Sequence, residues 1–336
     1  MNNKKFVHAL WMSTALAFLA EATLAQTPSP ALLVLEKSDS MLAIVDPATL
    51  KIAGRVPAGP DPHEVVASPD GRFAYITNYG GGGRGALHTI SVVDLATQKA
   101  LPAVDLGVLR GPHGIDFADG RVYFTAEANK AIGRLDATGK QVEWLLGTGQ
   151  NATHMVIVSK DTRRIFTSNI ASDTITIIDS ESGGGSGGWN ETQVHVGKGP
   201  EGFDVSPNGK EVWAANSQDG SVSVIDVASK KVVQTIEAGT KHSNRLKFSP
   251  DGKLVLVSDA GASDLIILDA GSRSVKKKLT VGRGPEGVLI APDGSHAYAA
   301  TAQDNSVAVI DMKSLEVSGH IATGNGPDGL AWARRK

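Results

Sequence analysis

The chain has no cysteine, few aromatic residues and little net charge. Without cysteine it cannot form a disulfide or carry a lipoprotein-type anchor, so packing alone must stabilise the fold. Aromatic residues make up 5% of the sequence and the formal net charge is −2. This balance gives no general attraction to DNA or anionic lipid, and the aromatic residues are not interleaved with basic ones as a base-stacking surface requires. The sequence therefore argues against a nucleic-acid partner.

Long hydrophobic runs are also missing beyond the N-terminus. There, Lys4 and Lys5 precede an apolar stretch that ends at Ala20, and small residues follow it. This order is typical of a cleaved secretory signal peptide, and the stretch is short for a membrane span. We predict a signal peptide at 1–25, a single domain over 26–336 and no membrane span in the mature chain. The predicted location is the periplasm of a bacterium, or outside the cell.

A repeated unit fills the rest of the sequence. Its marker is an aspartate that ends a short hydrophobic run, at Asp46, Asp94, Asp136, Asp179, Asp226, Asp269 and Asp311. Within each unit, runs rich in valine and isoleucine alternate with turn residues, such as Pro207-Asn208-Gly209, which is the pattern of strands joined by hairpins. Successive markers are 42 to 48 residues apart. Units of about four strands that repeat at this spacing are typical of propeller blades. The sequence predicts an all-β, seven-bladed β-propeller with four antiparallel strands per blade.

The two ends of the chain complement each other. The last unit, opening at Gly326, stops after one strand, whereas the first unit, which includes Asp46, lacks its opening strand. Joined, the two fragments make one complete blade. We therefore predict that the strand at 327–332 pairs with the strands that begin near Leu32, which would close the ring and remove an exposed sheet edge.

The amino-acid sequence of the repeats resembles that of the YVTN β-propeller family. The resemblance is carried by Tyr75-Ile76-Thr77-Asn78, by the Ser-Pro-Asp-Gly turns at 68–71 and 249–252, and by the Val-Ile-Asp strands. It covers essentially the whole mature chain and implies the propeller fold. It does not fix a function, because such propellers include lactonases, lyases, nucleic-acid binders and scaffolds.

Polar residues open all the predicted inner strands, and these openings should share one face of the ring. Counting back from the first turn of each blade gives His63, His113, His154, Glu201, Asn244, Glu286 and Asp328, and Arg245 adds positive charge beside Asn244. Three interpretations remain open. In the first the lining is polar only because it faces water, in the second it forms a metal-free ligand pocket, and in the third it holds a divalent metal ion through His63, His113, His154, Glu201 and Glu286. In either ligand-binding case the largest hollow should lie at this mouth.

One blade carries a second resemblance. Residues 111–127, which include Gly111-Pro112-His113-Gly114 and end at Glu127, resemble the repeat of the streptogramin lyases. Those enzymes open a cyclic ester with a metal, a histidine and a glutamate at the channel mouth. The resemblance implies His113 and Glu127 as catalytic candidates, and we add His154 from the neighbouring blade. Related propellers that hydrolyse sugar lactones provide a similar analogy.

These observations lead first to a binding or scaffold propeller that presents a His/Glu-lined mouth to a small ligand or protein partner. The alternative is a metal-assisted lactonase, or a streptogramin-lyase-like enzyme, acting on a cyclic ester. Binding of single-stranded nucleic acid is a second alternative. The sequence leaves open whether the protein is an enzyme, and no cofactor is certain beyond the possible divalent metal ion.

Overall fold

A computed structural model describes residues 27–80, 87–181 and 188–335. The predicted signal peptide lies outside these ranges. Within them the chain forms 28 strands and three short 3₁₀ turns, η1 (Lys37–Asp39), η2 (Glu127–Asn129) and η3 (Ile170–Ser172). None of the described helical segments has the length and apolar character that crossing a membrane requires.

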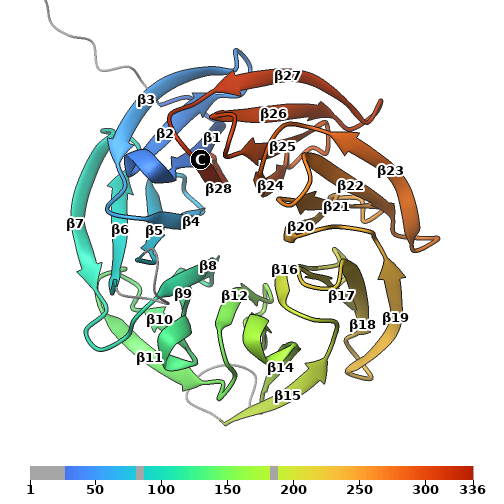
Figure 1. The fold of residues 1–336 in the computed structure, drawn as a ribbon. Helices are drawn as coiled ribbons and strands as arrows, with labels where there is room; N and C mark the ends of the chain where they lie inside the picture. Colours follow the sequence, from blue (N-terminus) through green and yellow to red (C-terminus); the bar gives the residue numbers. More distant parts are fainter. Residues whose placement is uncertain (1–26, 81–86, 182–187, 336) are drawn as a thin grey trace, which may run out of the picture.

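The strands form seven antiparallel four-stranded sheets arranged in a ring around a central axis (Figure 1). The inner strands are β4 (Pro62–Ala67), β8 (Pro112–Ala118), β12 (Thr153–Val158), β16 (Pro200–Val205), β20 (Ser243–Phe248), β24 (Pro285–Ile290) and β28 (Pro327–Ala333). The second strands are β5 (Phe73–Asn78), β9 (Arg121–Ala126), β13 (Arg164–Asn169), β17 (Glu211–Asn216), β21 (Leu254–Asp259), β25 (His296–Thr301) and β1 (Ala31–Glu36). The third strands are β6 (Thr89–Asp94), β10 (Ala131–Leu135), β14 (Thr174–Ser180), β18 (Ser221–Asp226), β22 (Asp264–Asp269), β26 (Ser306–Asp311) and β2 (Met41–Asp46). The outer strands are β7 (Lys99–Asp105), β11 (Val142–Gly147), β15 (Trp189–His195), β19 (Lys231–Glu237), β23 (Ser274–Thr280), β27 (Glu316–Ala322) and β3 (Lys51–Pro57).

We number the blades that begin at β4, β8, β12, β16, β20 and β24 as blades 1 to 6. The closing blade has the order β28-β1-β2-β3, and the C-terminal β28 lies beside the N-terminal β1 in Figure 1. Their register pairs Leu32 with Trp332 and Val34 with Leu330. The predicted fold and its closure by the two ends of the chain are therefore confirmed.

The repeated aspartate has a local cause. Asp226 ends β18, and its carboxylate accepts hydrogen bonds from the Ser229 backbone N–H at 2.7 Å and the Ser229 hydroxyl at 2.6 Å. A short acidic side chain that bonds the backbone two or three residues ahead stabilises a tight turn. Six of the seven marker aspartates accept such backbone bonds at the turn into the outer strand. Asp179 differs, since it instead pairs with Arg164 at 2.5 Å and Lys230 at 2.7 Å.

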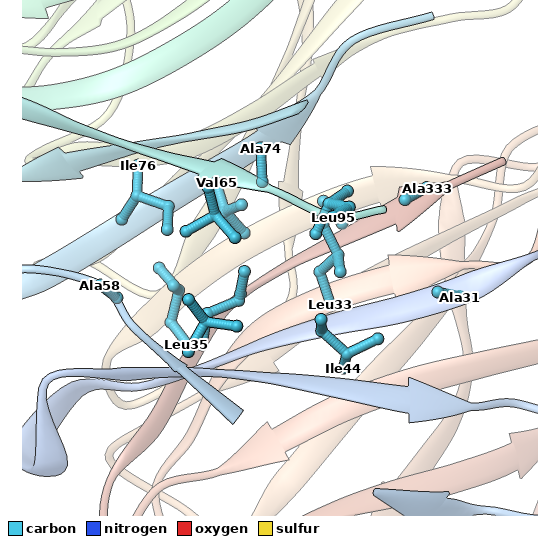
Figure 2. Packing of buried hydrophobic residues seen from close by; sticks show 14 residues of the cluster. Ala31, Leu33, Leu35, Ile44, Ala58, Val65, Ala74, Ile76, Leu95 and Ala333 are labelled. Atoms are coloured by element: carbon cyan, nitrogen blue, oxygen red, sulfur yellow. The ribbon is translucent and has the colours of Figure 1, made fainter. Parts of the chain in front are cut away.

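Apolar side chains fill the spaces between blades. Figure 2 shows the cluster that joins the closing blade to blade 1, with Leu33, Leu35 and Ile44 on one side and Val65 and Ile76 on the other. The first three of these side chains are fully buried. Because a blade cannot bury both faces of its sheet alone, each such junction stabilises two blades at once.

We expect Leu33→Ala to lower the free energy of unfolding by about 2–5 kcal/mol, since it leaves a cavity at the junction that completes the ring. Leu145→Ala on outer strand β11 is the matched control, because Leu145 is 52% exposed. Urea unfolding followed by circular dichroism measures both variants. Equal small effects would contradict the importance of this junction.

Candidate active site

A β-bulge in each inner strand aims one side chain at the channel mouth. In blade 1, Pro62 pairs with Asn78 but Val65 pairs with Ile76, so His63 and Glu64 together face one residue, Thr77. The same one-residue shift occurs in the other six blades. A bulge bends its strand and redirects a side chain. The first bulge residue is in every case the predicted channel residue, and we call these seven the first ring: His63, His113, His154, Glu201, Asn244, Glu286 and Asp328.

Hydroxyl groups between blades fix the backbone of this ring. The Thr77 hydroxyl accepts the Glu64 N–H at 3.2 Å and donates to the His113 carbonyl of the next blade at 2.7 Å. Thr125, Ser168 and Ser258 donate in the same way to the carbonyls of His154, Glu201 and Glu286, at 2.7, 2.9 and 2.7 Å. Four of the seven junctions therefore position a first-ring residue through a buried or part-buried hydrogen bond.

Three imidazoles and a phenol gather on one side of the mouth. The ring centroids of His63 and His113 are 4.7 Å apart, and those of His113 and His154 are 3.7 Å apart with an interplanar angle of 31°. Tyr79 contacts His63 and His113 with centroids at 4.9 and 5.2 Å. Its hydroxyl donates to Glu127 Oε2, while Glu127 Oε1 lies 3.7 Å from His154 Nδ1. The structure thus brings together the three catalytic candidates of the sequence.

Several imidazole nitrogens in this cluster form no hydrogen bond within the described part of the protein. Among the described residues, Nδ1 of His63, Nδ1 of His113 and both ring nitrogens of His154 are buried without a hydrogen-bond partner. Buried polar atoms in proteins are normally paired, so an unpaired group indicates a ligand, water or ion position. Burial lowers the pKa of His113 well below its usual value, and the neighbouring His154 and His63 lower it further. His113 is therefore a neutral imidazole at neutral pH, with a lone pair on one ring nitrogen.

Lys37 extends the cluster toward the closing blade. Its Nζ lies 2.7 Å from His63 Nε2 and 3.3 Å from Asp328 Oδ2. Since an ammonium can only donate, Nε2 of His63 accepts and the ring proton is on Nδ1, 3.6 Å from Asp61 Oδ1. Burial lowers the pKa of His63 to about 4, with Asp328 acting against this shift and Lys37 with it.

Charged groups occupy the other side of the mouth. Arg245 follows Asn244 on β20 and is 5% exposed. Its Nε donates to Glu64 Oε1 at 2.8 Å, although Glu64 belongs to blade 1 across the channel. Its Nη1 donates to Asn244 Oδ1 at 2.8 Å, and Asn244 Nδ2 donates to Glu201 at 2.9 Å. Burial opposes the charge of Arg245, but Glu64 and the other carboxylates raise its pKa on balance.

Sequence reasoning missed Lys37, Asp61 and Glu64. A signal for the first was available, because the residue that follows each second strand lies on the same face as the first ring. In blade order from the closing blade, this second ring reads Lys37, Tyr79, Glu127, Ile170, Ser217, Ala260 and Ala302. Side chains that are both large and polar occur only in the closing blade and blades 1 and 2. That sector is where the three histidines meet, so function is concentrated on one part of the ring.

The predicted metal arrangement is not formed by these side chains. Within the described ranges, no group of three histidine, aspartate or glutamate residues is placed to hold a metal ion. Nearly stacked rings such as His113 and His154 direct their lone pairs side by side rather than at one point. The unpaired imidazole nitrogens have donor chemistry that suits zinc or copper, but a divalent ion at His63, His113, His154, Glu201 and Glu286 remains a prediction.

One cavity lies at the opposite end of the inner strands from the mouth, so it does not confirm the prediction that the largest hollow lies at the mouth, which stays a prediction. This cavity of about 930 Å³ is lined by the first turns of blades 3 and 4, with Phe166 and Phe248 in its wall. The carboxylates of the cavity are already used: Asp179 pairs with Arg164, and Asp204 accepts the Phe248 N–H at 2.9 Å.

Fold and site together define a seven-bladed propeller with an acid–base cluster at one channel mouth. The chain belongs to the lactonase, seven-bladed β-propeller family, whose model matches residues 56–238. The finer YVTN assignment is not confirmed by this match. No curated protein sequence matches the chain significantly.

Solved structures share the fold at low sequence identity. A functionally unknown protein from Desulfotomaculum acetoxidans has a TM-score of 0.76 at 14% identity, covering 92% of this chain and all of its own. A candidate 6-phosphogluconolactonase from Bacteroides uniformis has 0.74 at 19%, covering 90% and 99%. The periplasmic gluconolactonase of Pseudomonas aeruginosa has 0.73 at 17%, covering 92% and 100%. These likenesses establish the fold alone.

Glu286 provides a pH-dependent test of this geometry. Burial, and then the nearby charge of Asp328, raise its pKa to about 7 from the ordinary 4.5. The folded protein therefore holds this proton when the unfolded chain has lost it, so this group lowers the free energy of unfolding as pH rises from about 4.5 to about 7. We expect the stability of Glu286→Gln relative to wild type to increase across that range and to level off above it.

Urea unfolding at half-unit pH intervals measures this difference. Glu316→Gln, on outer strand β27 of the same blade, is the matched control because Glu316 is exposed and far from the channel. A Glu286→Gln difference that stays constant from pH 4 to pH 8 would show that Glu286 does not sense the burial and the carboxylates described above.

Proposed function

We propose that the protein hydrolyses a small cyclic ester at the His/Glu side of the channel mouth. The observation that carries the proposal is the set of buried imidazole nitrogens without partners on His63, His113 and His154, beside Glu127. Membership of the lactonase propeller family supports it, and so favours this alternative over the binding or scaffold role to which the sequence first led.

The chemistry of ester hydrolysis suits these groups. The imidazole of His113 or of His154 accepts a proton from water, and the oxygen of that water attacks the ester carbonyl carbon. The carbonyl electron pair moves to oxygen. When the tetrahedral intermediate collapses, the ring C–O bond breaks, and the imidazolium returns its proton to the leaving oxygen. Glu127 orients His154 and stabilises the imidazolium that forms during the reaction. A divalent ion, if the site binds one, would supply polarisation of the carbonyl or activation of the water.

The charges of the mouth favour an uncharged, hydroxylated lactone. Asp328, Glu201 and Glu286 supply acceptors for sugar hydroxyls. The cations Lys37 and Arg245 are already held by carboxylates, so a phosphate group would meet an excess of negative charge. We therefore propose an aldonolactone without a phosphate group as the substrate, in line with the name of the Pseudomonas aeruginosa neighbour, a gluconolactonase.

Purified protein without a His tag should accelerate hydrolysis of D-glucono-1,5-lactone above the buffer rate, measured as acid release at constant pH. It should act less well on the 6-phosphorylated lactone. We expect His113→Ala and His154→Ala each to lower kcat/KM by about 10²–10⁴-fold, because they remove the general base or its neighbour. His320→Ala on exposed outer strand β27 is the control and should keep full activity.

Two further arms separate the alternatives. Metal analysis and chelation of the same preparation, with the His113→Ala/His154→Ala double variant, distinguish a metal-assisted reaction from one that uses the side chains alone. A macrocyclic ester tests the lyase alternative. If the folded protein hydrolyses none of these cyclic esters, the proposed activity is wrong and a binding role is favoured instead.

We also propose that the protein works in the periplasm or outside the cell. The signal-peptide pattern at 1–25 supports this location, and a periplasmic neighbour of the same fold is compatible with it. Expression of the full chain in a bacterium should give a mature protein that begins near Gln26 in the exported fraction, as read by intact mass. An uncleaved protein retained in the cytoplasm would contradict the proposal.

A further inference from the structure

Among the residues that the structure describes, Lys37 is the accessible positive charge that contacts the imidazole cluster. It begins η1, directly after strand β1, and its side chain is 33% exposed. The backbone around it is tied to the last part of the chain, since Lys37 N–H donates to the Gly326 carbonyl at 3.0 Å and Ser38 N–H to Asn325 at 3.2 Å. The ammonium is thus carried by a fixed turn rather than by a free loop.

The Lys37 ammonium has three N–H donors, and two of them are directed at groups of the protein. One points to His63 Nε2 at 2.7 Å and a second to Asp328 Oδ2 at 3.3 Å. The remaining carboxylate, Asp61, is 4.0 Å from Nζ, which is beyond hydrogen-bond distance. A third donor with partial solvent access therefore remains for an oxygen atom of a bound molecule.

The other positive groups of the mouth cannot replace it. Arg245 is 5% exposed and is committed to Glu64 and Asn244. Lys241 and His242 precede β20 in blade 5, across the channel from the imidazoles. Burial keeps His63 and His113 uncharged at neutral pH, because the pKa of each is lowered. Among the described residues, Lys37 is therefore the partly exposed cation that contacts the imidazole cluster, through His63.

We propose that Lys37 binds the carbonyl oxygen of the lactone and stabilises the negative charge that this oxygen gains when water attacks. The inference rests on the proposed lactone hydrolysis and adds a catalytic residue to it. In the attack, the new C–O bond forms from water, the carbonyl electron pair moves to the oxygen held by Nζ, and the imidazole takes the water proton. Collapse returns that electron pair to the carbonyl and expels the ring oxygen, which takes the proton back. No other reactant is needed.

The same contact assigns a different role to His63. With Nε2 accepting from Lys37 and Nδ1–H directed toward Asp61, His63 has no free lone pair for a proton from water. It is a positioning residue that holds the ammonium in place, whereas His113 and His154 retain unused nitrogens. The three histidines of the first ring, equivalent by sequence, are thereby divided into one that orients and two that react.

The test compares Lys37→Met, Lys37→Arg and the control Lys51→Met on D-glucono-1,5-lactone. Lys51 lies on exposed outer strand β3 of the same blade. Removing a donor to a developing oxyanion lowers kcat by about 10²–10³-fold with little change in KM, so this is the loss expected for Lys37→Met. Lys37→Arg should recover part of it, and Lys51→Met should match wild type.

Two readouts separate catalysis from structure. Inhibition by 1,5-anhydroglucitol, a cyclic polyol without a carbonyl group, should be equal in wild type and Lys37→Met, since Lys37 is assigned only to the carbonyl oxygen. NMR titration of His63, assigned with a His63→Gln variant, should show its pKa rising in Lys37→Met because the neighbouring cation is gone.

The outcomes distinguish the two proposals. If wild type hydrolyses the lactone but Lys37→Met keeps its kcat, or loses anhydroglucitol binding to the same degree as activity, the role of Lys37 is overturned while lactone hydrolysis stands. If wild type hydrolyses no cyclic ester, the proposed function fails and Lys37 falls with it. If Lys37→Met does not fold, Lys37→Arg provides the test. Complete loss of kcat in a folded Lys37→Arg protein, with the pKa of His63 unchanged, would also overturn the role.

Discussion

Closure of the ring by β28 and β1 is the constraint on which the rest of the structure depends. Once the first and last strands share a sheet, seven inner strands must surround one channel. Equivalent bulges then direct equivalent side chains to one point, although His63 and Asp328 are far apart in sequence. Each blade buries its apolar faces against two neighbours, so the position of the mouth residues is maintained by the packing of the whole ring.

The mouth separates uncharged from charged groups within a small space. On one side, burial favours the neutral form of His63 and His113, and their pKa values are lowered. On the other, carboxylates gather around Arg245 and Glu286. The two sides act on stability in opposite directions, since buried imidazoles lose stability as pH falls below about 6.5 while Glu286 loses it as pH rises toward 7. Between about pH 4.5 and 6.5 the two trends oppose each other, so the mouth contributes less pH dependence to stability there than either side would alone.

The sequence predicted the fold well because its signals are local and repeated. The turn aspartates, exemplified by Asp226, mark the same hairpin in blade after blade, and the incomplete units at the two ends indicate how the ring closes. The first ring was found for the same reason, as its members occupy one repeat position. Lys37 and Glu64 were missed because their roles depend on contacts between blades. The Arg245–Glu64 pair joins residues 181 positions apart, and neither repeat unit carries a sequence pattern that predicts its partner.

The Arg245–Glu64 pair also adds a connection that the order of the blades does not supply. A guanidinium from blade 5 and a carboxylate from blade 1 meet across the ring, and Arg245 is almost fully buried. Neighbouring blades are held together by the apolar packing between them, whereas this pair joins two blades that are not neighbours. The ring is therefore tied through its centre as well as around its circumference, so a displacement of blade 5 acts directly on blade 1.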